Sequence, residues 1–240
     1  DPVLQPYGSK THEVIHSVGR TGLNAILLDA AEGTGPVELV FGRSIDRVDL
    51  ETSTIHFADG GTAESGVILG ADGVGAPLRP ALTGAGSCVW NADRLDHDYK
   101  ELTLPAGPTG EHQLDRNALH IWPRGEFMLI ALANPGGDFT VTLFAPSATF
   151  AHLDGGGDVD EFFAEHFPDF AALTPDLADQ FRHNPTGRLA TLRTTGWSHE
   201  DRAVILGDAA HAIVPFHGQG MNAAMESARA LARHLAETPD

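Results

Sequence analysis

The chain has 240 residues, with 15 Lys or Arg against 33 Asp or Glu, which gives a formal net charge of −18. A field of this sign repels nucleic acids and anionic membrane surfaces, so we expect neither as a partner. No apolar run is long enough for a transmembrane helix. The single cysteine, Cys88, excludes an intrachain disulfide and agrees with a reducing, cytoplasmic location.

The first part of the chain has the pattern of alternating strands and helices. We expect a helix over 21–32, because its apolar residues recur at helical spacing and a Gly/Pro segment ends it. Strand-like patterns cover 12–18, 37–41, 45–50 and 53–60, the last two as a β-hairpin. The short apolar run 66–73 is typical of a strand in a parallel sheet that is covered on both faces.

From about residue 87 the pattern changes to four strand-like segments with turn residues and no helix between them: YKELTLP, ALHIWP, EFMLIALA and DFTVTLFA. This spacing predicts an antiparallel sheet. Two short amphipathic helices, VDEFFAEHFPDF and TPDLADQF, come next. RAVILG then returns to the buried-strand pattern, before a last amphipathic helix that begins near residue 221. The predicted class is α/β (α+β), an α/β region interrupted by an antiparallel sheet.

The segment 204–222 brings several unusual residues together after a buried-type strand. The strand ends at Gly207-Asp208, which places a carboxylate at the carboxyl edge of a sheet, where open α/β folds bind ligands. Gly218 and Gly220 permit close approach of a ligand, and the following helix directs free N–H groups to the same place. Two interpretations are open from the residues alone: Asp208 binds a ligand such as a polyol phosphate, or it caps a structural turn.

Two other interpretations of this segment are excluded. Gly218, Gly220 and Ala223 match the dinucleotide fingerprint G-x-G-x-x-A, which needs its first glycine directly after a strand. Here residues 207–217 separate strand and glycine, so we reject a nicotinamide-binding Rossmann site. His211 and His217 have no further ligand at metal spacing, so we expect no metal site.

Two long motifs resemble signatures of the FAD-dependent group A aromatic hydroxylases. GDAAHAIVPFHGQGMNAAMESA is similar to their second flavin-binding motif, and GADGVGAPLR, residues 70–79, resembles their Asp-Gly motif. The two stand in the expected order, about 140 residues apart. PYGSK, SVGRTGLN, YKELTLP, LHIWPRGEFMLIAL, FTVTLF and FFAEHFPD further resemble the members that hydroxylate kynurenine, so the likeness covers nearly the whole chain.

The resemblance implies a partial, Rossmann-like FAD-binding domain, residues 1–86 and 197–240, with an inserted antiparallel substrate domain at 87–196. It also implies hydroxylation of a small, kynurenine-like aromatic substrate by O2, with FAD as cofactor, NADPH as reductant and a flavin C4a-hydroperoxide as the oxygen donor. The protein positions the ring and excludes water, so no nucleophilic side chain is needed. The alternative is a truncated, cofactor-free remnant or binding module without redox activity.

The resemblance also assigns roles to three groups of residues. Those expected to bind FAD are Arg20, Ile45, Asp72, Asp208, Gly218, Gly220, Met221 and Asn222. Those expected to bind the substrate are Tyr7 and an apolar wall of Leu119, Ile121, Ile130, Leu132, Thr142 and Phe144. Pro215, Phe216 and His217 are expected beside the flavin, where oxygen reacts. From the residues alone, such alternating apolar positions on a sheet are usually ordinary core.

The chain also departs from the family pattern. The strand and G-x-G-x-x-G turn that hold the ADP half of FAD, and a C-terminal helical region, are expected outside residues 1–240. We therefore expect a fragment that does not retain FAD tightly by itself. Within the chain, Ala76 stands where the Asp-Gly motif usually has Ser, and MESA replaces FEDC. These changes leave the reaction class better defined than the substrate.

Overall fold

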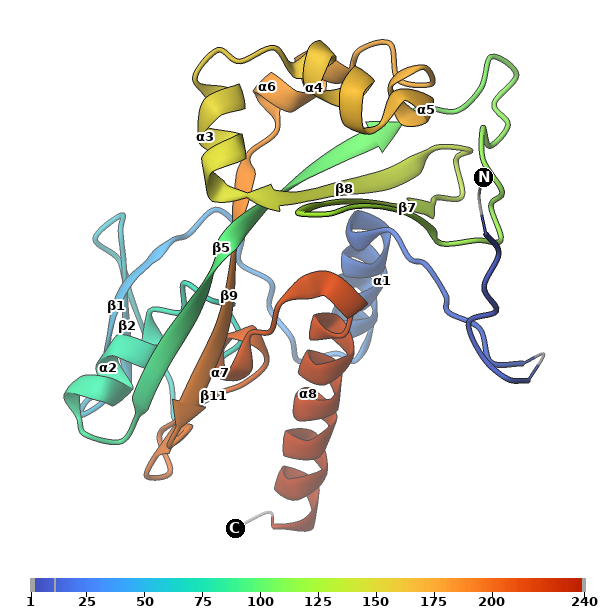
Figure 1. Cartoon of the computed structure of the whole chain (residues 1–240). Coiled ribbons are helices and arrows are strands. Elements are labelled where there is room, and N and C mark those ends of the chain that lie inside the picture. Colours follow the sequence, from blue (N-terminus) through green and yellow to red (C-terminus); the bar gives the residue numbers. More distant parts are fainter. Residues whose placement is uncertain (1–2, 11, 239–240) are drawn as a thin grey trace. The chain divides into compact units, whose positions relative to one another are not determined.

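The structure is a computed structural model that describes residues 3–10 and 12–238, and the chain divides into two compact units (Figure 1). Unit 1 comprises Asp1–Leu39 and His97–Gly187, and unit 2 comprises Val40–Asp96 and Arg188–Asp240. Two long strands, β5 (Val89–Leu104) and β9 (Thr186–Thr195), contribute residues to both units.

Unit 1 contains the predicted antiparallel sheet. Its strands are β6 (His120–Arg124), β7 (Phe127–Ala133) and β8 (Phe139–Pro146) together with β5 and β9, in the order β6-β7-β8-β5-β9. The pairs β6–β7, β7–β8 and β8–β5 are antiparallel, so the predicted antiparallel sheet is confirmed, although β5 lies beside β8 and the strands do not follow one another in chain order. Strand β9 was not predicted, because its buried residues Leu189 and Leu192 are three positions apart and show no strand-like alternation.

Four helices cover one face of this sheet (Figure 1): α3 (Ser147–Asp154), α4 (Val159–His166), α5 (Pro168–Ala171) and α6 (Leu177–His183). The core lies between them and the sheet, with Phe163, Phe167 and Phe181 fully buried. Helix α4 begins where the side chain of Asp158 accepts a hydrogen bond from the Glu161 N–H, an ordinary N-cap. The helices predicted at α4 to α6 are confirmed, whereas α3 was not predicted.

Helix α1 (Arg20–Gly33) also belongs to unit 1 and confirms the predicted helix, although none of its residues is buried. The strands predicted over 12–18 and 37–41 are wrong, since both segments are irregular. An extended segment becomes a strand only when its backbone pairs with a neighbour. Neither segment pairs with any strand in the described part of the chain.

Unit 2 contains two small sheets. In one, β1 (Ile45–Asp49), β2 (Thr54–Phe57) and β3 (Thr62–Glu64) form an antiparallel meander, whose first pair is the predicted hairpin. In the other, the order is β10 (Ser198–His199), β11 (Ala203–Ile205) and β4 (Ile68–Gly70), and β11 runs parallel to β4. The parallel strand is confirmed, but Leu69 is 52% exposed, so β4 is not covered on both faces.

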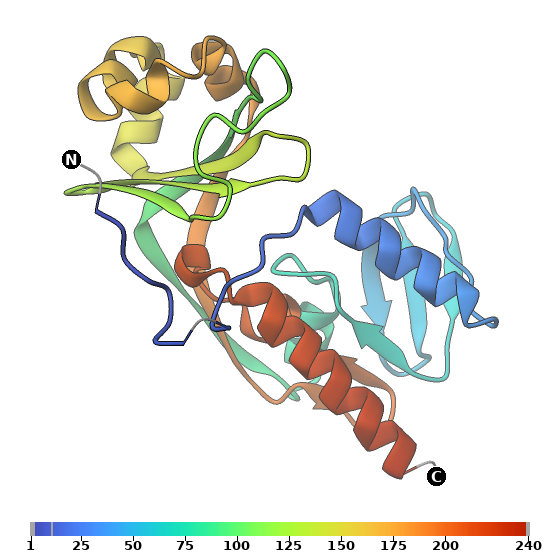
Figure 2. The same ribbon diagram turned by 90° about the vertical axis from the view of Figure 1, so that its right-hand side faces the viewer.

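The remaining elements of unit 2 are α2 (Leu78–Gly84), α7 (Asp208–His211), the 3-10 turn η1 (Pro215–His217) and the long helix α8 (Gly220–Glu237) (Figure 2). The predicted last helix is confirmed, yet no residue of α8 is buried. Within 3–10 and 12–238, no helix combines the length and apolar character needed to cross a bilayer, and no group of metal-type ligands gathers.

Candidate functional site

The turn after β11 presents Asp208 to solvent. Gly207, the residue before it, has φ 58° and ψ −141°, a conformation that favours glycine. A Cβ at Gly207 would lie 3.1 Å from the Cβ of Ala224, so this turn also approaches α8 closely. Asp208 is the exposed first residue of α7. No other residue in the described part of the chain donates a hydrogen bond to its carboxylate, so that group is available to a ligand.

The first turn of α8 begins beside this carboxylate. Gly218 has a left-handed φ of 61°, and Gly220 is the first helical residue. A Cβ placed on Gly220 would lie 3.9 Å from Oδ1 of Asp208. No side-chain cap satisfies the N-terminus of α8 within the described residues. Met221 and Asn222 are both exposed in this first turn. The free backbone N–H groups at the N-terminus of α8 therefore lie close to the Asp208 carboxylate.

One hydrogen bond holds α8 against α7, and an aromatic contact fixes the same histidine. Nε2 of His211 lies 2.8 Å from Oγ of Ser227, and the ring of Trp197 lies 5.3 Å from that of His211 between centroids. The Ser227 hydroxyl donates to the carbonyl of Ala223 at 3.0 Å. Since the hydroxyl proton is used there, Nε2 of His211 is the donor in the first contact.

Ile45 and Asp72, both predicted to bind FAD, line one hollow in unit 2 with a volume of about 230 Å³. Its apolar lining includes Ile55 and Leu78. Arg79 is buried and donates from Nη2 to the carbonyl of Val74, in the loop after Asp72, and from Nη1 to the Ala209 carbonyl at 2.9 Å. This arginine therefore ties the Asp-Gly motif to the Asp208 turn.

The three residues predicted near the reacting oxygen form η1, immediately before Gly218. Pro215 and Phe216 are exposed, Phe216 by 39%. The side chain of His217 lies outside the described part of the structure.

In unit 1 the predicted wall residues lie on the face of the sheet that is opposite helices α3 to α6. Ile121 pairs with Ile130, and Ile130 pairs with Thr142, so these three form one cross-strand row. Leu132 and Phe144 lie on the same face, one row to either side. Residues directly opposite in an antiparallel sheet point to the same face, and the alternate residues form the buried core.

The remaining predicted site residues of unit 1 are Leu119, Tyr7 and Arg20. Leu119 directly precedes β6 and is 38% exposed. Tyr7 lies in an irregular segment and is 68% exposed. Arg20 is the first residue of α1, and its Nη2 lies 3.5 Å from Oε1 of Glu101 on β5. Glu101 was not singled out from the sequence.

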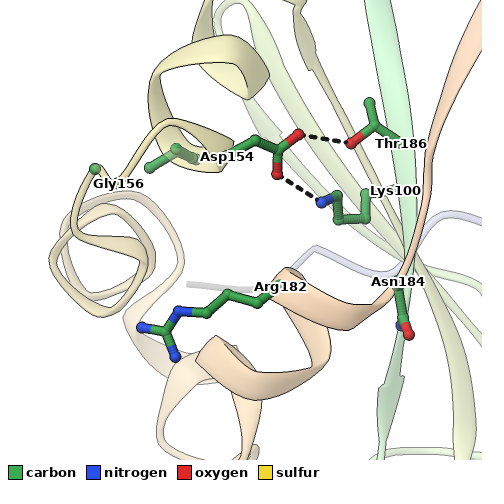
Figure 3. Close-up of a pocket in the computed structure, with 8 residues that line it drawn as sticks. Lys100, Asp154, Gly156, Arg182, Asn184 and Thr186 are labelled. Atoms are coloured by element: carbon green, nitrogen blue, oxygen red, sulfur yellow. Dashed lines mark hydrogen bonds and ion pairs between the residues drawn. The ribbon is translucent and has the colours of Figure 1, made fainter.

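A second hollow, with a volume of about 420 Å³, lies in unit 1 on the side of the sheet that the helices α3 to α6 cover (Figure 3). At its edge, Nζ of the buried Lys100 donates to Oδ1 of Asp154 at 2.9 Å and to the Phe181 carbonyl at 2.7 Å. Nζ also lies 4.0 Å from the centroid of the Phe181 ring. The other oxygen of Asp154 accepts from Thr186. Because these partners satisfy the ammonium, we assign this cluster a structural role.

Comparison with known proteins identifies the relatives of this chain. A sequence profile of the FAD binding domain family matches residues 171–239, which include the Asp208 turn and α8. Kynurenine 3-monooxygenase from Stenotrophomonas maltophilia is 43% identical over all of this chain, and that from Myxococcus xanthus is 44% identical over 93% of it. This chain is a homologue of the kynurenine 3-monooxygenases. It spans about half the length of these relatives, 54% and 50% respectively.

The fold also resembles that of a solved oxygenase structure. The solved structure of 2-methyl-3-hydroxypyridine-5-carboxylic acid oxygenase matches with a TM-score of 0.72 at 22% identity, covering 90% of this chain and 57% of the oxygenase. The predicted resemblance and the predicted mixed fold class are therefore confirmed.

Proposed function

We propose that this chain is part of an FAD-dependent monooxygenase that hydroxylates a small, kynurenine-like aromatic substrate with O2, using NADPH as reductant. One observation carries the proposal: an exposed carboxylate, Asp208, lies beside the uncapped first turn of α8, in a segment matched by the FAD binding domain profile.

The residues of this turn suit the chemistry of a flavin. The Asp208 carboxylate only accepts hydrogen bonds, so it would bind hydroxyl groups of the ribityl chain. The N–H groups of Met221 and Asn222, at the positive end of the helix dipole, would face the edge of the ring where negative charge develops. The hollow lined by Ile45 and Asp72 offers a second contact region. Bound FAD would accept electrons from NADPH and activate O2.

The sheet of unit 1 would hold the aromatic substrate. Ile121 and Ile130 give an apolar surface on which a ring can lie, and Thr142 continues the same row with a hydroxyl group. This surface positions the ring and keeps water from the reacting atoms. Tyr7, in the irregular segment before α1, would bind the substrate carboxylate.

Flavin binding is tested by titrating the purified chain with FAD and following flavin fluorescence. We expect saturable quenching with a dissociation constant below about 1 mM. Asp208→Ala should weaken it, and the matched control Asp201→Ala, which removes an exposed carboxylate from a turn of unit 2, should not. Absence of saturable binding would contradict the proposal and support the cofactor-free alternative.

The activity is tested in the Stenotrophomonas maltophilia enzyme by exchanging its matching half for this chain. We expect the hybrid to retain FAD in its absorption spectrum and to consume O2 and NADPH faster when kynurenine is present. A hybrid that retains FAD and hydroxylates no kynurenine would contradict the proposed substrate.

A further inference from the structure

The apolar wall of unit 1 ends in a charged residue. Glu101 on β5 lies directly opposite Thr142 on β8, so the row Ile121, Ile130, Thr142 continues with Glu101. Among the paired residues of β5 to β8 on this face, Glu101 carries the only negative charge. The row is therefore apolar at β6 and β7 and negatively charged at β5.

The Glu101 carboxylate is accessible. Its side chain is 50% exposed, and its ion pair with Arg20, 81% exposed, is 3.5 Å long. Exposed ion pairs of this kind contribute little free energy, so the loss of this one would oppose a new partner for Glu101 only weakly. The backbone of Glu101 is fixed independently, because its carbonyl accepts a hydrogen bond from Nδ2 of Asn184 at 2.8 Å. A change of the side chain can therefore be made without removing this anchor.

The spacing of the row suits a substituted ring. Adjacent strands lie about 4.8 Å apart, so Ile130 and Glu101, which are two strands apart, are separated by about 10 Å. A benzene ring on Ile121 and Ile130 would direct one substituent past Thr142 toward the carboxylate. A carboxylate only accepts hydrogen bonds, and such a bond is stronger than one to a neutral acceptor.

We propose that Glu101 contacts the substrate and determines its specificity, by accepting a hydrogen bond from an amino group on the aromatic ring. This inference rests on the proposed role of the wall. The predicted wall is apolar except for Thr142. The inference adds Glu101 to it and names the substrate group that Glu101 would recognise, the ring amino group.

The test is an NMR titration of the full chain with two probes, 2-aminoacetophenone and acetophenone, which differ only in the amino group. We expect both to shift the signals of Ile121, Ile130 and Thr142, and the amino compound to bind about three- to tenfold more tightly. Glu101→Gln keeps a neutral acceptor and should reduce this preference. Glu101→Met removes the acceptor and should abolish it. The control Glu126→Gln, an exposed carboxylate between β6 and β7, should leave the preference unchanged.

Each outcome decides between the two proposals. If both probes bind the wall equally well, the role of Glu101 is wrong and the proposed wall stands. If neither probe shifts the wall signals, the wall and the role of Glu101 are both wrong. An equal loss of preference in Glu126→Gln would show a general charge effect and would also overturn the inference. If Glu101→Met fails to give a folded spectrum, the comparison of Glu101→Gln with Glu126→Gln carries the test.

Discussion

Nε2 of His211 donates a hydrogen bond to Oγ of Ser227, 2.8 Å away and sixteen residues further along the chain. The contact joins α7, which begins with Asp208, to the second turn of α8. One turn earlier, Ala224 lies against Gly207, where no side chain would fit without a shift. Together the two contacts fix the first turn of α8 beside the Asp208 carboxylate.

Ser227→Ala should lower the free energy of unfolding by about 0.5–1.5 kcal/mol, because His211 loses its acceptor. It should also weaken FAD binding severalfold, since α8 is held less firmly. Urea denaturation and FAD titration measure the two effects. Ser227→Thr retains a hydroxyl group and should restore both, and an unchanged stability in Ser227→Ala would show that the contact contributes nothing.

Asp208→Ala should reduce the affinity for FAD about ten- to a hundredfold, because a hydrogen bond to a charged group contributes about 1.5–3 kcal/mol. The melting temperature without FAD should stay unchanged, since the carboxylate accepts no hydrogen bond from another described residue. Fluorescence titration and thermal denaturation are the two measurements. Normal FAD affinity combined with a lower melting temperature would mean that Asp208 is a structural cap.

Asp154→Leu should destabilise the chain more than Lys100→Met does. The first change leaves the Lys100 ammonium, which is 2% exposed, without its carboxylate, whereas the second replaces a buried cation by an apolar side chain of similar length. We expect a loss of about 1.5–3 kcal/mol for Asp154→Leu, from the hydrogen bond to a charged group. Equal or reversed losses in urea denaturation would contradict the structural role of this pair.

The carboxyl group of Asp59 should titrate below 3.8, its usual pKa. Hydrogen bonds from Arg43 lower this pKa, with a further contribution from the N–H of Gly61. The folded state thus favours the ionised form, so the stabilisation is present above the ordinary pKa and is lost as the pH falls through the lowered one. Carbon-detected NMR should show the pKa of Asp59 rising in Arg43→Met, and an unchanged pKa would exclude this cause.

The purified chain should associate as its concentration rises. Leu69 on β4 and Met221, Met225 and Leu235 on α8 are each at least 40% exposed, which leaves apolar surface open to other molecules. Sedimentation velocity over a series of concentrations measures this. The double variant Met225→Gln, Leu235→Gln should associate less, whereas the control Asn222→Gln should behave as the parent chain does.

Local sequence patterns were sufficient for most of the secondary structure. Strand-like apolar runs bounded by turn residues predicted β7 and β8. The residues of each strand that share a face follow from alternation, because successive side chains in a strand point to opposite faces. The predicted wall row of Ile121, Ile130 and Thr142 follows from this rule once the register is known. The same rule failed for β9, whose two buried leucines lie three residues apart.

What the sequence alone determined about this protein is the chemistry of its turns: a carboxylate after Gly207, and glycines at 218 and 220 ahead of a helix. These depend only on neighbouring residues, whose backbone angles are set by local sterics. The tertiary structure decided which residues meet across the chain. Glu101 reaches Arg20 from 81 residues away, and segment 37–41 stays irregular because none of the described strands pairs with it. Such contacts depend on strand register and helix packing, which no local pattern specifies.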